Sequence, residues 1–153
     1  MKHPDALWHD LVYRFAGQSR CRTRHVGAIL VDSSGHVIGQ GWNSAPSGSD
    51  CWDCRRCNSG AASGEALGAA ICTHAEANAI GHCAMAGIAT AGTTLICTTR
   101  PCAECAKLII AAGIAFVRYF EEYPSTDDAL DMLSRAGVSV LAGALLEEET
   151  RHD

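Results

Sequence analysis

The apolar positions in the first 42 residues predict one helix followed by two strands. Residues 5–17 repeat apolar side chains at helical spacing and end at Gly17, a common helix stop. The residues of this apolar face are Leu7, Leu11, Val12 and Phe15. Residues 26–31 form an apolar run typical of a buried strand, and residues 36–42 predict a second strand. Because residues 32–35 (Asp-Ser-Ser-Gly) favour a turn, we expect an antiparallel hairpin.

Helices and strands alternate in the second half of the chain. The expected helices are 74–86, the segment from Pro101 to the stop at Gly113, and 125–136. The expected strands are 93–98, 115–120 and 138–141. Strands separated by helices imply parallel crossovers, whereas the first hairpin is antiparallel. We therefore expect an α/β fold with three layers (α/β/α) and a mixed five-stranded sheet.

Two segments depart from this pattern. Residues 44–72, the cysteine-rich segment, are rich in Gly, Ser, Ala and Cys and predict a long irregular insertion. Such a loop in a compact domain is usually functional. The acidic tail, residues 143–153, predicts a helix end or a disordered terminus. With no internal repeat or linker, residues 1–153 are expected to form a single domain.

Composition narrows the functional classes. Apolar residues make up 48% of the chain, but no apolar run is long enough for a membrane span or a signal peptide, so we expect a cytoplasmic protein without membrane contact. A net charge of −5 with 12 Lys and Arg argues against binding to a nucleic acid polymer. It allows one small phosphorylated ligand held by one or two arginines. Nine cysteines in a cytosolic chain indicate metal binding rather than disulfides.

The strongest chemical signal is a pair of short motifs, His74-Ala-Glu76 and Pro101-Cys102-Ala-Glu-Cys105. The pattern H-x-E with P-C-x-x-C is typical of zinc-dependent nucleobase deaminases. A histidine and two cysteines supply three zinc ligands and leave a position for water, as catalytic zinc sites do. Cys102 and Cys105 are three residues apart and share one helical face.

Each motif also has a structural alternative. Thr73 and Glu76 have the spacing of a capping box, which would make Glu76 a helix cap. Pro101 is also a common first residue of a helix. We expect His74 and Glu76 to lie in an exposed first turn, where Glu76 can accept a proton from water and deliver it to a ring nitrogen and then to the leaving amine.

Longer stretches carry a family resemblance. They are residues 19–31, 41–48, 74–80, 98–114, Tyr123-Pro124 and 136–140. In these stretches the chain resembles the deoxycytidylate deaminases of the cytidine-deaminase-like superfamily. The resemblance implies hydrolytic, zinc-dependent deamination at C4 of dCMP, which yields dUMP and ammonia for pyrimidine deoxynucleotide synthesis. It also implies that His74, Cys102 and Cys105 bind zinc and that Glu76 is the proton shuttle.

The resemblance also suggests substrate contacts. Asn43 resembles the asparagine that holds the sugar, although a strand-end asparagine can simply satisfy a turn. Arg24, with Arg22 as a substitute, is the candidate for the phosphate. The remaining expected substrate contacts are Asn78, Ala75 and Tyr123.

One substitution leaves the nucleotide open. The family usually has Gly after the aromatic-Asn pair, and here Ser44 adds a hydroxyl where backbone normally approaches the ligand. CMP or a 5-modified dCMP therefore remains an alternative substrate.

The other cysteines predict a second metal site. The candidate ligands of this structural zinc are Cys21, Cys51, Cys54, Cys57 and Cys72, of which the middle three have C-x-x-C-x-x-C spacing. Unpaired thiols or surface redox chemistry are the alternatives. Cys83 and Cys97 are expected to be small core residues.

Three other functions are alternatives to dCMP deamination. A tRNA adenosine deaminase would need a basic surface that this acidic chain lacks. A free-cytidine deaminase would more often join its last strands by a hairpin than by a helix. A non-enzymatic zinc module would have a closed metal site and no role for Glu76. The resemblance and the apolar helices favour a homo-oligomer, and the resemblance allows allosteric control by dCTP and dTTP.

Overall fold

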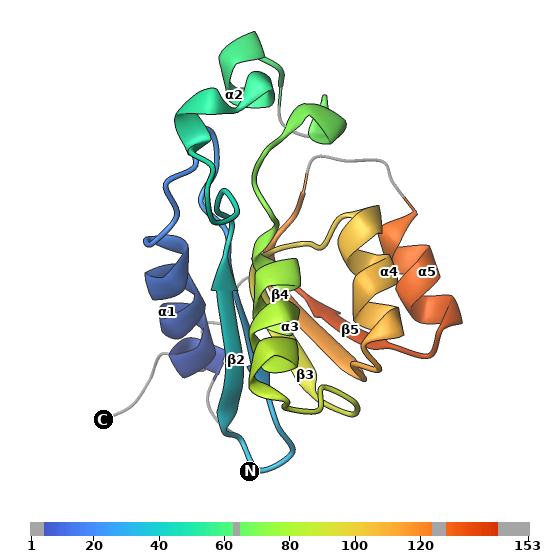
Figure 1. Ribbon diagram of the computed structural model, residues 1–153. Coiled ribbons are helices and arrows are strands. Elements are labelled where there is room, and N and C mark those ends of the chain that lie inside the picture. The colour runs from blue at the N-terminus through green and yellow to red at the C-terminus, as the bar shows by residue number, and fades with distance from the viewer. Residues whose placement is uncertain (1–4, 63–64, 124–127, 144–153) are drawn as a thin grey trace.

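The computed structural model describes residues 5–62, 65–123 and 128–143 (Figure 1). Its five strands form one sheet in the order β2-β1-β3-β4-β5. Their bounds are β1 Gly27–Val31, β2 Val37–Trp42, β3 Thr94–Thr99, β4 Phe116–Glu121 and β5 Ser139–Ala142. Strand β1 pairs antiparallel with β2 and β3, whereas β3, β4 and β5 are mutually parallel neighbours. The predicted hairpin and parallel crossovers are therefore confirmed.

Helices cover both faces of the sheet. The longer helices are α1 Asp5–Ala16, α3 Ala75–Ala86, α4 Ala103–Ala111 and α5 Ala129–Arg135. On one face, Val12 of α1 packs in a cluster with Ile29 and Ile96 of the sheet. On the other, α3, α4 and α5 bury their small and aliphatic residues against the same strands. The three-layer α/β/α fold is confirmed, and its interior strand β1 is buried on both faces, as its unbroken apolar run predicts.

Helix α3 approaches β2 unusually closely, because glycine lines the contact. A Cβ added at Gly41 would lie 2.4 Å from the Ala75 carbonyl oxygen and 2.5 Å from the Ala79 nitrogen. One at Gly39 would lie 2.5 Å from the Cys83 sulfur. No side chain fits at these distances, so the absence of Cβ atoms lets the first turn of α3 rest directly on the strand.

The cysteine-rich segment leaves and re-enters the fold at one point. Ser44 and Thr73 pair as an isolated antiparallel bridge, with N–H···O distances of 3.1 and 2.8 Å. Between them the segment contains the short helices η1 Cys51–Asp53, α2 Arg55–Ser59 and η2 Leu67–Ala69. The expectation of a wholly irregular insertion is therefore wrong. Figure 1 shows α2 beyond the end of β2, above the point where α3 begins.

Arg118 of β4 ties the N-terminal helix to the far edge of the sheet. Its buried guanidinium donates to the Asp5 carboxylate at 2.8 and 3.0 Å and to the Gly143 carbonyl at 2.8 Å. It also lies 4.3 Å from the Phe120 ring centroid. These contacts fix where α1 crosses the sheet.

The remaining sequence predictions concern the last helix, the acidic tail and membrane spans. The last helix begins at Ala129, later than residue 125, and residues 124–127 lie outside the described part of the chain. Most of the acidic tail, residues 144–153, also lies outside it. Among the residues that the structure describes, no helix combines the length and apolarity of a membrane span.

Candidate active site

Two helices begin at the same edge of the sheet and bring three potential metal ligands together. His74 is the N-cap residue of α3 and Cys102 is the N-cap residue of α4, and neither side chain forms a capping hydrogen bond. The capping box, the structural alternative for Thr73 and Glu76, does not form, because the backbone of Thr73 pairs with Ser44 and the helix starts one residue later. Pro101 precedes the N-cap instead of opening the helix. Both cap side chains are thus available to a ligand.

The three ligand atoms match one zinc ion. His74 Nδ1 lies 3.4 Å from Cys102 Sγ and 3.3 Å from Cys105 Sγ, and all three atoms lie within 4.8 Å of one another. Zinc bonds to imidazole nitrogen and thiolate sulfur put neighbouring ligand atoms roughly 3.5 Å apart in a tetrahedron. One nitrogen and two sulfurs also form a donor set that suits zinc. Within the described residues, no other three such side chains come this close.

The hydrogen bond between the two cysteines favours the thiolate of Cys102 and raises the pKa of the Cys105 thiol. Hydrogen bonds from the Cys105 thiol and from His74 lower the pKa of Cys102 to about 4. Burial opposes this shift, since it penalises the charged form. A thiolate is the form that binds metal.

Glu76 lies beside this triad and is almost fully buried, with 4% of its surface exposed. The expected exposed first turn is therefore wrong for Glu76, and His74 is itself half-buried. The cause is the contact of α3 with Gly41, which presses the first turn onto β2. Burial raises the pKa of the Glu76 carboxyl, because its anion loses hydration.

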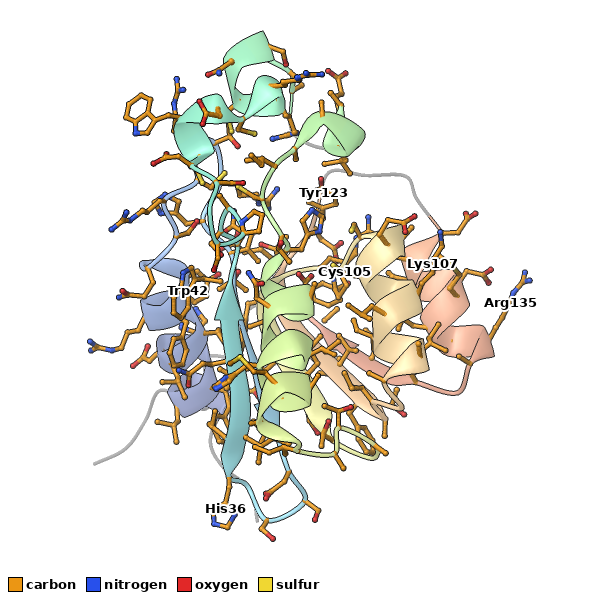
Figure 2. All side chains as sticks on the ribbon, in the orientation of Figure 1. His36, Trp42, Cys105, Lys107, Tyr123 and Arg135 are labelled. Carbon is orange, nitrogen blue, oxygen red and sulfur yellow. The ribbon has the colours of Figure 1, made fainter. Side chains whose placement is uncertain are left out.

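A cavity of about 320 Å³ opens at this site. The predicted site residues on its wall are Arg24, Asn43, His74, Ala75, Glu76, Cys102 and Tyr123. The guanidinium carbon of Arg24 lies 5.1 Å from the Tyr123 ring centroid, so the two side chains stack at one side of the cavity. Figure 2 shows Tyr123 on the side of Cys105 that faces the cysteine-rich segment.

Asn43 shapes the cavity through the backbone that it holds. Its amide nitrogen donates to the Arg24 carbonyl at 2.8 Å, and its amide oxygen accepts from the Val26 N–H at 2.8 Å. The side chain is therefore occupied on both ends by the stretch that leads into β1. It fixes the direction of that stretch, and its contact with a sugar stays a prediction.

Two predicted substrate residues lie away from the cavity. Arg22 donates to the Asn58 side chain at 2.7 Å and lies 4.7 Å from the Trp52 ring centroid. Asn78 donates to the Trp42 carbonyl at 2.8 Å and to the Ser44 hydroxyl at 3.2 Å. The Ser44 hydroxyl is thus directed at α3, and neither Asn78 nor Ser44 is on the cavity wall.

Two arginines on the cavity wall were not predicted from the sequence. Arg100 is buried; its Nε lies 3.5 Å from a Glu122 carboxylate oxygen and its Nη2 donates to the Tyr123 carbonyl at 3.3 Å. Arg56 reaches the cavity from α2. Arg100 could have been predicted, because it directly precedes the Pro101-Cys102 motif. Arg56 lies inside the C-x-x-C-x-x-C motif, where the sequence indicates only a solvated loop residue.

The five remaining cysteines outside the core gather near the same cavity. Sulfur atoms of Cys51 and Cys72 lie 3.5 Å apart, and the Thr23 hydroxyl lies 3.4 Å from the Cys21 sulfur and 3.8 Å from that of Cys57. Sulfurs also interact between Cys21 and Cys57, between Cys21 and Cys72, and between Cys54 and Cys57. No three of these sulfurs lie as close together as the atoms of the His74 triad. Four of the five line the cavity: Cys21, Cys54, Cys57 and Cys72. Cys83 and Cys97 are buried in the core as predicted.

The fold and the site together define a class of protein, a three-layer α/β domain with a His-Cys-Cys metal centre at two helix starts and a buried glutamate beside it. The family described as "Cytidine and deoxycytidylate deaminase zinc-binding region" matches residues 3–121. The chain belongs to this family, and the zinc-binding region of the family's description fits the group of His74, Cys102 and Cys105.

Individual relatives agree with this assignment. The chain is 31% identical over 147 residues to deoxycytidylate deaminase of Saccharomyces cerevisiae, covering 94% of the chain and 46% of that protein. It is 41% identical over 113 residues to deoxycytidylate deaminase of Mycobacterium phage D29, covering 70% of the chain and 86% of that protein. The chain thus spans less than half of the yeast relative.

A solved structure is similar over nearly the whole chain. It is dCMP deaminase of the cyanophage S-TIM5 in complex with dCMP and dUMP, with a TM-score of 0.75 and 32% identity. The match covers 93% of this chain and 99% of that one. Fold and family are therefore established by two kinds of comparison.

Proposed function

We propose that this chain hydrolyses dCMP to dUMP and ammonia. The observation that carries the proposal is the buried Glu76 carboxyl beside a zinc triad in a cavity that also presents arginines. Proteins similar to the chain are named deoxycytidylate deaminases, and one was solved with dCMP and dUMP. The substrate assignment for this chain rests on that combination.

In this proposal three residues bind the metal and a fourth transfers protons. His74, Cys102 and Cys105 hold the zinc, which supplies a water of lowered pKa when bound. Glu76 is not needed as a ligand, so its carboxyl is available to accept a proton in the dry cavity. It returns that proton to the ring nitrogen of cytosine. It then carries the second proton of the attacking water, from the hydroxyl group formed at C4, to the amine that leaves C4.

Ordered residues around the triad would bind the rest of the nucleotide. Asn43 fixes residues 24–26 by two hydrogen bonds, which sets the direction of the Arg24 side chain. Arg24, stacked near Tyr123, is the proposed phosphate ligand on this side of the cavity. Ala75 is fully buried and adds a small, flat surface where a base can approach the triad.

The experiment is a comparison of ammonia release from dCMP, CMP, 5-methyl-dCMP, deoxycytidine and an RNA hairpin. We expect the highest kcat/KM for dCMP, since the cavity offers guanidinium groups to a phosphate and the chain carries a net charge of −5. A faster reaction with CMP or 5-methyl-dCMP would move the assignment to that nucleotide. Deamination of the RNA hairpin alone would replace the dCMP assignment with a tRNA function. Absence of ammonia release from all five substrates would favour a non-enzymatic zinc module.

A second, structural zinc is part of the proposal. Cys21, Cys51, Cys54, Cys57 and Cys72 supply more thiols than one tetrahedral site needs, and contacts between neighbouring sulfurs link all five. An ion would draw four of them into one site. Metal closure of a segment with little apolar content would supply the order that its own packing lacks.

We also propose that the chain works as one domain in a homo-oligomer. Exposed apolar side chains at Met85, Phe116 and Leu141 are candidates for burial between copies. Nine cysteines without a disulfide fit the reducing cytoplasm. Sedimentation with and without dCTP or dTTP would measure the subunit number and test the proposed control by these nucleotides.

A further inference from the structure

Arg56 is an unusual residue of the cysteine-rich segment, because it lines the cavity that holds His74 and Glu76. It belongs to the short helix α2, between Cys54 and Cys57. Its neighbour Arg55 is exposed and is not on the cavity wall. The two adjacent arginines therefore differ in direction, and the fold selects only one of them for the site.

The Arg56 guanidinium is held firmly by neutral oxygens. Its Nε donates to the Glu65 carbonyl at 2.8 Å, its Nη2 to the Ala62 carbonyl at 3.0 Å, and its Nη1 to the Thr23 hydroxyl at 3.2 Å. Arginine has five N–H donors, so three are used and two remain. Over the described ranges, no carboxylate forms an ion pair with Arg56, so its charge is fixed in place without being neutralised.

The other arginines of this region are used differently. Arg100 is paired with Glu122 at 3.5 Å, and Arg22 is directed at Trp52 away from the cavity. Arg24 and Arg56 also reach the cavity, Arg24 from the stretch before β1 and Arg56 from the cysteine-rich segment. Thr23 connects them, since it is next to Arg24 in the chain and accepts a hydrogen bond from Arg56.

We propose that Arg56 binds the 5′-phosphate of the substrate together with Arg24, so that the cysteine-rich segment supplies half of the phosphate site. This inference rests on the proposed deamination of a cytosine nucleotide. A phosphate monoester carries close to two negative charges, and two ordered guanidinium groups match it. Because three hydrogen bonds already fix Arg56, little side-chain entropy is lost when phosphate binds.

The consequence is a link between the five-cysteine group and the proposed phosphate site. The Thr23 hydroxyl contacts the sulfurs of Cys21 and Cys57 as well as Arg56. Whatever orders those sulfurs also orders the arginine. The cysteine-rich segment then contributes to selecting the nucleotide over the nucleoside.

The test compares Arg56→Gln with Arg55→Gln, which makes the same charge change on the same helix outside the cavity. For Arg56→Gln we expect kcat/KM for dCMP to fall about tenfold to a hundredfold, mainly through KM, the range for one charge-assisted hydrogen bond. Deoxycytidine, which has no phosphate, should change far less. Arg55→Gln should match the wild type with both substrates.

Product binding gives a readout that does not depend on turnover. In calorimetry, Arg56→Gln should weaken dUMP by the same factor and leave deoxyuridine nearly unchanged, while Arg56→Lys should retain part of the dUMP affinity. Equal losses for nucleotide and nucleoside would mean that Arg56 only holds the loop, and would overturn the inference. A wild-type protein that binds dUMP but releases no ammonia would instead refute the proposed reaction and leave the phosphate site standing.

Discussion

The His74 triad and the five-cysteine group use the same kind of ligand in two different settings. The triad is carried by α3 and α4, whose apolar residues belong to the main core, and its three ligand atoms already lie within 4.8 Å. The five-cysteine group joins Cys21 to four cysteines on a segment of short helices, and no three of its sulfurs lie as close together as the triad atoms. Core packing positions the triad without metal, whereas the proposed second site would need a metal ion to bring its sulfurs together.

The largest expected effect is the loss of turnover in Glu76→Gln. The amide cannot shuttle a proton, so kcat should fall by about a hundredfold to ten-thousandfold or more. Zinc measured by elemental analysis should stay unchanged, because Glu76 is not needed as a ligand. Near-normal activity of a metal-loaded Glu76→Gln protein would reduce Glu76 to a structural residue.

Removing thiols from the five-cysteine group tests the other side of the comparison. Wild-type protein should carry about two zinc ions per chain, and Cys51→Ser with Cys57→Ser should carry about one. The thermal midpoint should fall by several degrees, because the segment loses its closure. The catalytic metal should survive.

Two measurements would contradict this picture. A single zinc in fully reduced wild-type protein would return these cysteines to ordinary loop residues. Loss of both metals in the double variant would show that the two sites are not independent.

Gly41→Ala should disturb the site that packing positions. The added Cβ would meet the Ala75 carbonyl oxygen and push α3 away from β2, at a cost of about 1–3 kcal/mol in unfolding free energy. Chemical denaturation measures this cost. Gly81→Ala is the matched control, because Gly81 lies in α3 itself with open space around it. This substitution should be neutral or slightly stabilising.

Unfolding free energies that are equal for Gly41→Ala and Gly81→Ala would show that close packing of α3 does not hold the triad. Activity gives a second readout of the same comparison. Only Gly41→Ala should lower kcat, because only it moves the turn that carries His74 and Glu76.

The smallest effect is expected for Ser44→Gly. The hydroxyl accepts from Asn78 at 3.2 Å, so its loss should cost about 1 kcal/mol of stability. The ratio of kcat/KM for dCMP and CMP should not change, since Ser44 is directed away from the cavity. A shifted ratio would show that this hydroxyl takes part in nucleotide selection after all.

Local patterns in the sequence were sufficient for most of the fold. The apolar run of β1 and the turn after it predicted the hairpin, and the alternation of helices and strands predicted the parallel part of the sheet. The triad was also predictable, because P-C-x-x-C places two ligands within one helical turn and H-x-E supplies the third.

What could not be predicted depends on contacts between distant residues. Thr73 has the local signature of a cap, but its backbone is paired with Ser44 at the other end of the cysteine-rich segment. The burial of Glu76 follows from the glycine at position 41. Arg56 reaches the cavity only because the carbonyls of Ala62 and Glu65 turn it there, and no short-range rule contains that information.

The Ser44–Thr73 bridge has a consequence for how this protein can change over evolutionary time. The bridge holds both ends of the intervening segment together by two backbone hydrogen bonds, which any side chain except proline leaves possible. The entropy of closing a loop rises only with the logarithm of its length. Insertions or deletions between the two residues should therefore change the stability of the core little. Substrate preference can then be altered in this segment while α3 and its sheet remain as they are.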